Sequence, residues 1–247
     1  MATAAQYTDP FLQTYTPVPV AGPGVCAICH SGPGPGHAVC YSCAEVMRQV
    51  SRPTRIVVPV SLYKLNSQLW HVLRYYKDGS GRSADLLAMQ VAAIIARFAA
   101  QHLRCVGRVL GGDPAVVTSV PSTRASLRPG THPLEAAVTR VGALASRYAP
   151  LLVRGSAYVD HNRADDDAFT LRRTLSGERV LVVDDTLTTG ARLQSAVSAL
   201  RRNGASAVAG LVVGRVIDPD WNDSCRLIWD QARATPFSFD ECCLCRH

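Results

Sequence analysis

The sequence of 247 residues predicts an α/β protein in which helices flank a parallel sheet, with a small amino-terminal four-cysteine module. Two observations lead to this fold class. An apolar run at 179–183 is followed by a helical pattern at 191–203 and a second apolar run at 205–213, the order of a strand–helix–strand unit with parallel strands and a right-handed crossover. Two C-x-x-C pairs precede it, in a stretch too rich in Gly and Pro to build a core of its own.

The segments before this unit also alternate between strand and helix patterns. Residues 56–60 predict a strand that Pro59 places at an edge or near a strand end, because proline cannot donate a ladder hydrogen bond. Residues 116–120 predict another short strand. Residues 83–103 and 133–147 carry apolar side chains at helical spacing, so each stretch predicts one helix with a buried face.

The remaining stretch before the unit is less regular. Residues 151–153 and 157–159 predict either a pair of strands or one bent strand, and the acidic residues 162–167 that follow are expected to form a flexible loop. Gly204 ends the helix of the unit.

Length and composition limit the possible arrangements. The chain is long enough for one main core with a small appendage. Hydrophobic residues make up 47% and charged residues 18%, which excludes disorder over most of the chain. No apolar run reaches the roughly 18 residues that span a bilayer, and the first 20 residues lack the pattern of a signal peptide, so we expect a cytoplasmic protein without a membrane partner.

We divide the chain into four parts. Residues 1–24 are rich in Pro, Thr and Ala without periodicity, which predicts a flexible arm or a segment laid across the surface. Residues 25–50 form the four-cysteine module, residues 51–220 the main domain, and residues 221–247 a carboxyl-terminal extension with a cysteine cluster.

The first cysteines predict a metal site. Cys26, Cys29, Cys40 and Cys43 supply four thiolates on two knuckles, enough for a closed tetrahedral zinc site of the ribbon type with a structural role. An iron–sulfur cluster is the alternative. His30 and His37 lie near enough in sequence to replace a cysteine, although loop histidines are more often solvated.

The end of the chain offers part of a second site. Cys242, Cys245 and His247 would need another ligand from the fold or from a second subunit, and a frayed tail of reduced cysteines, Cys243 included, is an equal alternative. Cys105 and Cys225 stand alone and are expected to be buried apolar residues.

The segment from Val180 to Ala191 carries the chemistry. It places Asp184 and Asp185 at the carboxyl end of a buried strand, where open α/β sheets bind ligands. The hydroxyl-rich turn that follows leads through Gly190 into a helix, so its hydroxyls and backbone N–H groups can cradle a phosphate. Adjacent carboxylates need a cation or hydrogen-bond donors, and a ribose diol supplies donors at a suitable spacing. The alternative is that these residues only cap a turn.

This segment resembles the phosphoribosyl-diphosphate (PRPP) signature of the type I phosphoribosyltransferases: four apolar residues, two acids, then T-x-T-T-G. The block at 70–79 and the proline-then-two-arginines loop at 120–130 are similar to those of the ComF-like competence-protein branch, which also has amino-terminal cysteine pairs. The resemblance covers most of residues 25–215 and implies a phosphoribosyltransferase-like sheet.

The resemblance implies displacement of diphosphate from PRPP by a nitrogen acceptor, with magnesium bridging the diphosphate and ribose oxygens. It implies catalytic roles for Asp184, Asp185, Arg124 and Arg128. It implies PRPP-binding roles for Asp184, Asp185, Thr186, Leu187, Thr188, Thr189, Gly190 and Lys77. The loop at 162–167 would close over the site, or else is a solvated acidic loop.

Two departures bear on the acceptor. After Arg128 the branch usually reads glycine, phenylalanine, asparagine, glutamine, whereas this chain reads Pro129, Gly130, Thr131 and His132. Purine-salvage relatives have an aspartate at the position of Thr188, so the acceptor is not expected to be recognised in their way.

Two other function classes remain open. One is a PRPP- or nucleotide-sensing protein without turnover, because fold does not determine function. The other is a DNA-uptake-associated adaptor, which the formal net charge of +7 supports only weakly, since that charge equally suits a polyanionic small molecule. The sequence does not identify the acceptor, and it leaves open whether the chain forms a homo-oligomer.

Overall fold

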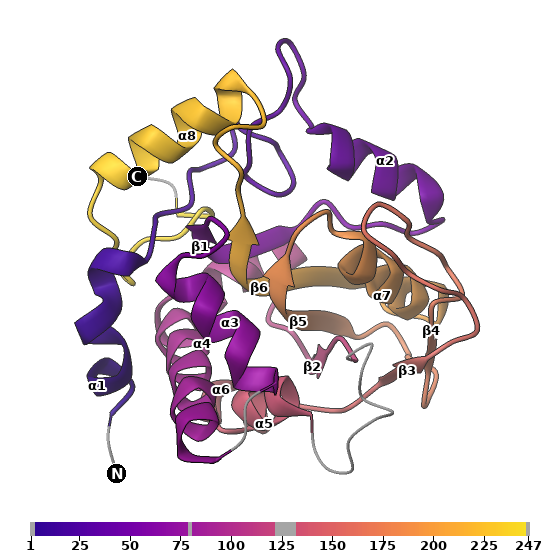
Figure 1. Cartoon of the computed structure of the whole chain (residues 1–247). Helices are drawn as coiled ribbons and strands as arrows, with labels where there is room; N and C mark the ends of the chain where they lie inside the picture. The colour runs from indigo at the N-terminus through magenta and orange to yellow at the C-terminus, as the bar shows by residue number, and fades with distance from the viewer. Residues whose placement is uncertain (1–2, 79–80, 122–131, 246–247) are drawn as a thin grey trace.

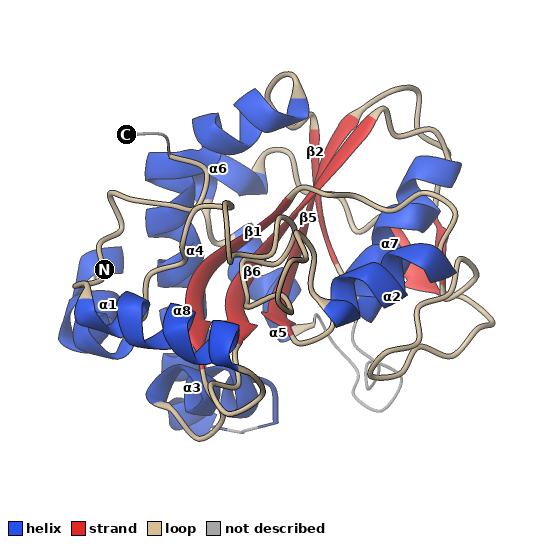
Figure 2. Ribbon diagram, turned by 90° about the horizontal axis from the view of Figure 1, so that it is seen from above, coloured by secondary structure: helices blue, strands red, loops and turns tan. Residues whose placement is uncertain are grey.

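The computed structural model describes residues 3–78, 81–121 and 132–245. Among them, four strands form a parallel sheet in the order β1 (Val57–Tyr63), β6 (Ala207–Val216), β5 (Arg179–Leu187) and β2 (Val116–Ser119). Helices cover both faces of this sheet (Figures 1 and 2). The predicted α/β class with a parallel sheet is therefore confirmed.

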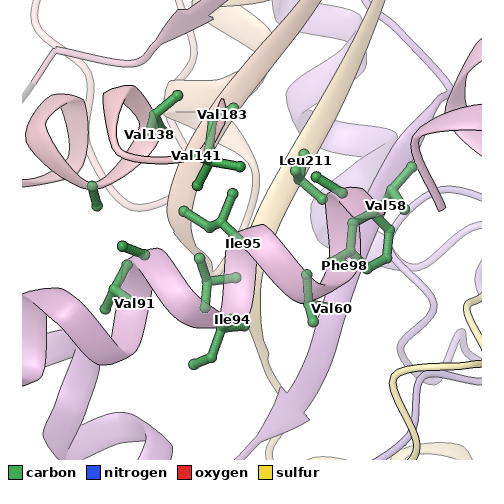
Figure 3. Packing of buried hydrophobic residues seen from close by; sticks show 14 of the residues in the cluster. Val58, Val60, Val91, Ile94, Ile95, Phe98, Val138, Val141, Val183 and Leu211 are labelled. Atoms are coloured by element: carbon green, nitrogen blue, oxygen red, sulfur yellow. The ribbon is translucent and has the colours of Figure 1, made fainter. Parts of the chain in front are cut away.

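One face of the sheet packs on four helices: α3 (Gln68–Asp78), α4 (Gly81–Leu110), α5 (Pro133–Thr139) and α6 (Gly142–Ala145). Val58, Val60, Val183 and Leu211 from the strands meet apolar side chains of α4, among them Val91, Ile94, Ile95 and Phe98 (Figure 3). By length and composition α4 could cross a membrane, but half of its apolar window is buried inside the molecule, as in a core helix.

The other face packs on α7 (Ala191–Arg202) and on α2 (Tyr41–Gln49) of the cysteine module. Successive side chains of a strand point to opposite faces. In β5, Leu181 and Val183 belong to the α4 side, whereas Val180 and Val182 belong to the α7 side. This alternation assigns the two acids at the end of β5 to different faces.

Strand β1 lies at an edge, as Pro59 predicts. Its outer side meets the amino-terminal segment, where the Leu62 N–H donates to the Thr16 carbonyl (2.9 Å) and the Thr16 N–H to Ser61 Oγ (2.9 Å). This contact covers backbone groups of an edge strand that could otherwise pair with another chain.

The amino-terminal segment, predicted to be a flexible arm or laid across the surface, has regular structure. It forms α1 (Ala4–Thr8) and the 3-10 helix η1 (Asp9–Thr14), and α1 lies beside α4 (Figure 1). Arg97 of α4 donates to Thr8 Oγ1 (2.8 Å) and pairs with Asp9. Tyr15, 3% exposed, enters the core. Contacts from α4 hold this segment in place.

Two of the predicted secondary-structure elements differ from the structure. The single helix predicted for 133–147 is broken into α5 and α6, because Val141 is extended (φ −88°, ψ 103°) and acts as N-cap of the second helix at Gly142. The strand at β3 (Leu152–Arg154) pairs antiparallel with β4 (Phe169–Leu171) and not with 157–159. Helices α2, α3 and α8 (Asp223–Ala234) were not predicted.

Candidate ligand site and metal centre

A cavity of about 480 Å³ opens at the carboxyl ends of β1, β5 and β6. Asp184, Asp185 and residues 186–190 line one side of it; residues 186–190, called the turn below, include the last two residues of β5 and lead into α7. Lys77 at the end of α3 lines another side. Arg192 in the first turn of α7 and residues 158–161 complete the wall. The predicted PRPP-binding residues among the described ones therefore lie around a single cavity.

Asp185 lies on the α3 side of the sheet and is 2% exposed. The Tyr76 hydroxyl donates to its Oδ2, and the Lys77 ammonium forms an ion pair with the same oxygen. Burial raises the pKa of Asp185, but the charge of Lys77 and the hydrogen bonds from Lys77 and Tyr76 outweigh it and hold that pKa below the ordinary value. Asp185 is therefore an ionised carboxylate held by two neighbours on α3.

Asp184 lies on the α7 side and is 3% exposed. Its Oδ1 accepts the backbone N–H of Asp185 (3.0 Å). Burial raises its pKa to about 6; the charge of Arg192 opposes the rise and that of Asp185 adds to it. The two acids thus have opposite pKa shifts, and Asp184 is the one whose charge is poorly compensated by the protein.

The turn after these acids is shaped for a helix N-terminus. Gly190 has φ +89°, a conformation that side chains with a Cβ rarely adopt, and it is the N-cap of α7. The Thr189 hydroxyl donates to the His161 carbonyl, and the Tyr63 hydroxyl lies 3.5 Å from Thr186 Oγ1. Thr188 is exposed. The turn thus joins exposed and anchored hydroxyls to the N-terminus of a twelve-residue helix.

The acidic segment expected to be a flexible loop is anchored instead. The Asp165 N–H donates to Ser195 Oγ (3.0 Å), the Ser198 hydroxyl donates to Asp166 (2.5 Å), and Arg202 pairs with Asp167 (3.1 Å). All three partners lie on α7. Residues 158–161 of the cavity wall are thus followed directly by a segment that is hydrogen-bonded to α7.

Arg124, Arg128 and His247, and with them Pro129, Gly130 and Thr131, lie outside the described residues. His132 is described: it is the N-cap of α5, and its Nδ1 accepts the Leu134 N–H (3.3 Å).

Arg192 and Tyr63 are among the cavity residues that the sequence reasoning missed. Arg192 donates to the Pro121 carbonyl (3.0 Å) and so connects α7 to the end of β2. Its position two residues after Gly190 could have indicated a role in the site. Because nearly all basic residues of this chain are arginines, a single arginine was weak evidence. Tyr63 ends β1, and nothing local in the sequence relates it to the turn at Thr186.

The four cysteines of the amino-terminal module meet as predicted. The sulfurs of Cys26, Cys29, Cys40 and Cys43 all lie within 4.8 Å of one another, and all four residues are buried. The sulfurs of Cys29 and Cys40 are 3.6 Å apart, and the backbone nitrogen of Cys40 lies 3.3 Å from Cys26 Sγ, to which it donates. Zinc bonds of about 2.3 Å in a tetrahedron separate sulfurs by about 3.8 Å, so the four residues fit a structural zinc ion.

His30 and His37, the possible substitutes for a cysteine ligand, do not belong to this cluster, and Cys105 and Cys225 were predicted to be buried apolar residues. His30 contacts the Pro19 carbonyl through Nδ1 (2.9 Å), and His37 is exposed. Cys225 is buried as predicted. Cys105 is buried as well, but it does not stand alone: His102, Cys242 and Cys245 surround it.

No protein-family model and no curated protein matches the chain. Solved structures similar to it include adenine phosphoribosyltransferase from Trypanosoma brucei in complex with AMP, pyrophosphate and ribose-5-phosphate (12% identity over 63% of this chain and 82% of that chain, TM-score 0.36). The same enzyme from Leishmania tarentolae shares 14% identity over 66% and 94% of the two chains (TM-score 0.35).

A third similar structure is the allosteric regulatory enzyme of purine biosynthesis, with 21% identity over 48% of this chain (TM-score 0.29); the match spans 26% of that chain. Two of these three structures are phosphoribosyltransferases. At such identities and TM-scores the similarity carries no conclusion about function, and the α/β fold class follows from the sheet and helices themselves.

Proposed function

We propose that this chain binds PRPP with magnesium and transfers its phosphoribosyl group to a nitrogen acceptor, with release of diphosphate. One observation carries the proposal: Asp184 and Asp185 lie near the carboxyl end of a buried parallel strand, and the hydroxyl-rich segment that follows enters α7 beside the same cavity. Carboxylates and a phosphate cradle at that spacing match the diol and the 5-phosphate of one ribose phosphate.

The two acids have different tasks in this proposal. Asp184, whose charge is poorly compensated, accepts hydrogen bonds from the ribose hydroxyls. Asp185 is held by Tyr76 and Lys77 and orients the end of β5. The turn 186–190 and the first N–H groups of α7 receive the 5-phosphate.

We expect magnesium to enter this site bound to the phosphate oxygens of PRPP. Carboxylate oxygens are acceptable magnesium ligands, but Asp184 and Asp185 are 3% and 2% exposed and Asp185 already has two partners. Substrate phosphate oxygens and water commonly complete the coordination of this ion. When bound, magnesium stabilises the charge of the departing diphosphate.

The cations of the cavity support the same reaction. Arg74, Lys77 and Arg192 line its wall, and Arg124 and Arg128 are expected to face the diphosphate. In the reaction the bond from the anomeric carbon to a diphosphate oxygen breaks and a bond to the acceptor nitrogen forms. Positioned cations favour this step because charge accumulates on the leaving group.

We also propose that the chain belongs to the ComF-like branch; the blocks at 70–79 and 120–130 and the amino-terminal cysteines support this. The alternative function is a non-catalytic PRPP or nucleotide sensor, or a DNA-uptake-associated adaptor. The observation that favours the sensor is His132, the N-cap of α5, which stands where the ComF-like branch has glutamine.

Calorimetry of PRPP with magnesium tests the proposal. The wild type is compared with Asp184→Asn/Asp185→Asn, and Asp230→Asn, the same chemical change at an exposed site of α8, serves as matched control. Binding by wild type and control but not by the double variant is expected. Absence of binding by the zinc-replete wild type would overturn the proposal.

Two further assays separate the function classes. Diphosphate release from PRPP against a panel of bases and amines detects turnover, and binding without turnover would favour the sensor. A shift of labelled single-stranded DNA at low salt, lost at higher salt, would favour the adaptor.

A further inference from the structure

A second group of metal-binding side chains lies away from the cavity. His102 and Cys105 come from α4, and Cys242 and Cys245 come from the carboxyl-terminal segment. His102 Nδ1 is 3.8 Å from Cys105 Sγ and 3.6 Å from Cys245 Sγ, and the sulfurs of Cys242 and Cys245 are 3.4 Å apart. All four ligand atoms lie within 4.8 Å of one another.

These distances agree with one tetrahedral zinc ion. Zinc bonds of about 2.3 Å to sulfur and about 2.0 Å to nitrogen place two sulfurs about 3.8 Å apart and a sulfur and a nitrogen about 3.5 Å apart. Three cysteines and one histidine are a usual ligand set for structural zinc, and four protein ligands leave no position open for substrate.

The histidine is oriented as a ligand. His102 Nε2 lies 2.8 Å from the Phe239 carbonyl oxygen, an acceptor, so this nitrogen carries the proton and donates. The Nδ1 lone pair is then directed at the sulfurs. A hydrogen bond from the second ring nitrogen to a carbonyl is the usual support of a metal-bound histidine.

Donors are also present for the sulfurs. The Leu244 N–H donates to Cys242 Sγ (3.4 Å), and Arg108 donates to Cys105 Sγ (3.2 Å). Zinc with three thiolates carries one negative charge, and the guanidinium of Arg108 offsets it. Cys243, between the two ligands, belongs to the apolar core and is 2% exposed.

We propose that His102, Cys105, Cys242 and Cys245 hold a second, structural zinc ion. Such an ion fastens the carboxyl-terminal segment to α4. The same segment places Phe237 and Phe239 against Tyr15, with ring centroids 5.3 and 6.1 Å from that ring. The metal therefore stabilises the contact of Tyr15 with Phe237 and Phe239, beside Gln90 and Arg97 of α4.

Metal content of the full-length protein, purified with a reductant and dialysed, tests this site. Two zinc ions per chain are expected for the wild type. Cys242→Ser/Cys245→Ser is expected to retain one, as is Cys40→Ser/Cys43→Ser, which removes the other cluster. Cys225→Ser changes a buried cysteine outside both clusters and is expected to retain two.

A second measurement avoids dependence on variants that fail to fold. X-ray absorption of the zinc-loaded wild type is expected to show sulfur and nitrogen scatterers in a ratio of seven to one. His102→Cys is expected to keep two zinc ions and lose the nitrogen scatterer. One zinc per folded wild-type chain, iron in place of the second zinc, or a Cys242–Cys245 disulfide would each overturn the proposal.

Discussion

The guanidinium of Arg215 lies 3.5 Å from Cys29 Sγ, so a buried cation of the central sheet touches the four-cysteine cluster. Its other terminal nitrogen donates to the carbonyls of Thr188 (2.6 Å) and Leu187 (3.2 Å). Burial lowers the pKa of Arg215, but the negative charge of Cys29 and Cys43 outweighs it and raises that pKa. One residue thus connects the metal module to the turn that lines the cavity.

Replacing this residue tests the connection. Arg215→Met keeps much of the side-chain volume but leaves two turn carbonyls without their donor and the thiolates without their cation. Breaking a buried charge pair costs about 3–5 kcal/mol of folding free energy. We expect a lower melting temperature and an affinity for PRPP with magnesium at least about tenfold weaker, which corresponds to about 1.4 kcal/mol of binding free energy.

Arg226→Met is the matched control, because Arg226 pairs with Asp220 at an exposed site of α8 (2.7 Å). Calorimetry and thermal unfolding measure both quantities. A folded Arg215→Met protein with wild-type affinity would show that the turn does not depend on this contact.

Removal of zinc from the four-cysteine cluster is expected to weaken PRPP binding although no cysteine of that cluster lines the cavity. Without the metal, residues 25–50 lose the bonds that hold a Gly- and Pro-rich loop, and Arg215 loses its ordered partner. Hydrogen exchange should rise first in residues 25–50 and then in the turn 186–190. Unchanged exchange in the turn after complete loss of zinc from this cluster would contradict the expectation.

The main unit of the fold was predictable because its signals are local. The apolar runs of β5 and β6 and the amphipathic pattern of α7 each lie within about a dozen consecutive residues. The pairing of β3 with β4 was not, because the partner strand lies beyond the acidic segment and is three residues long. Local periodicity says which residues form a strand but not which strand they join.

The candidate site divides in the same way. The turn 186–190 was visible as a motif, whereas Tyr76 and Lys77 reach Asp185 only because α3 packs against the end of β5. The second cysteine cluster is the clearest case. His102 and Cys245 are 143 residues apart in sequence, and only the packing of the chain end on α4 brings them together.

Lys77→Met is expected to destabilise the protein by about 3–5 kcal/mol at pH 7, because it leaves Asp185 buried without its ammonium. The folded-state pKa of Asp185 is lowered, so its ion pair stabilises the protein above the unfolded pKa and is lost as pH falls through the folded pKa. The stability difference between wild type and variant should therefore shrink in acid. Lys77→Met/Asp185→Asn should recover most of the stability at pH 7, and thermal unfolding across pH measures the cycle.

Asp184→Asn should have the opposite effect on stability. The folded pKa of about 6 lies above the ordinary 3.8, so the folded state binds more protons between these values and the free energy of unfolding decreases as pH rises through this window. The ionised carboxylate thus lowers stability at pH 7 by up to about 3 kcal/mol. Asparagine removes that charge, so the ligand-free variant should melt at a higher temperature than wild type at pH 7.5 and at a similar temperature at pH 4.

The same substitution should abolish PRPP binding, because the amide replaces one acceptor oxygen with a donor. In the wild type, affinity for PRPP with magnesium should fall as pH decreases below about 6, where Asp184 becomes protonated. Calorimetry from pH 5 to pH 8 measures this dependence. A more stable variant without binding would identify Asp184 as a residue kept for the ligand at the expense of stability, whereas a less stable variant at pH 7.5 would assign it a structural role.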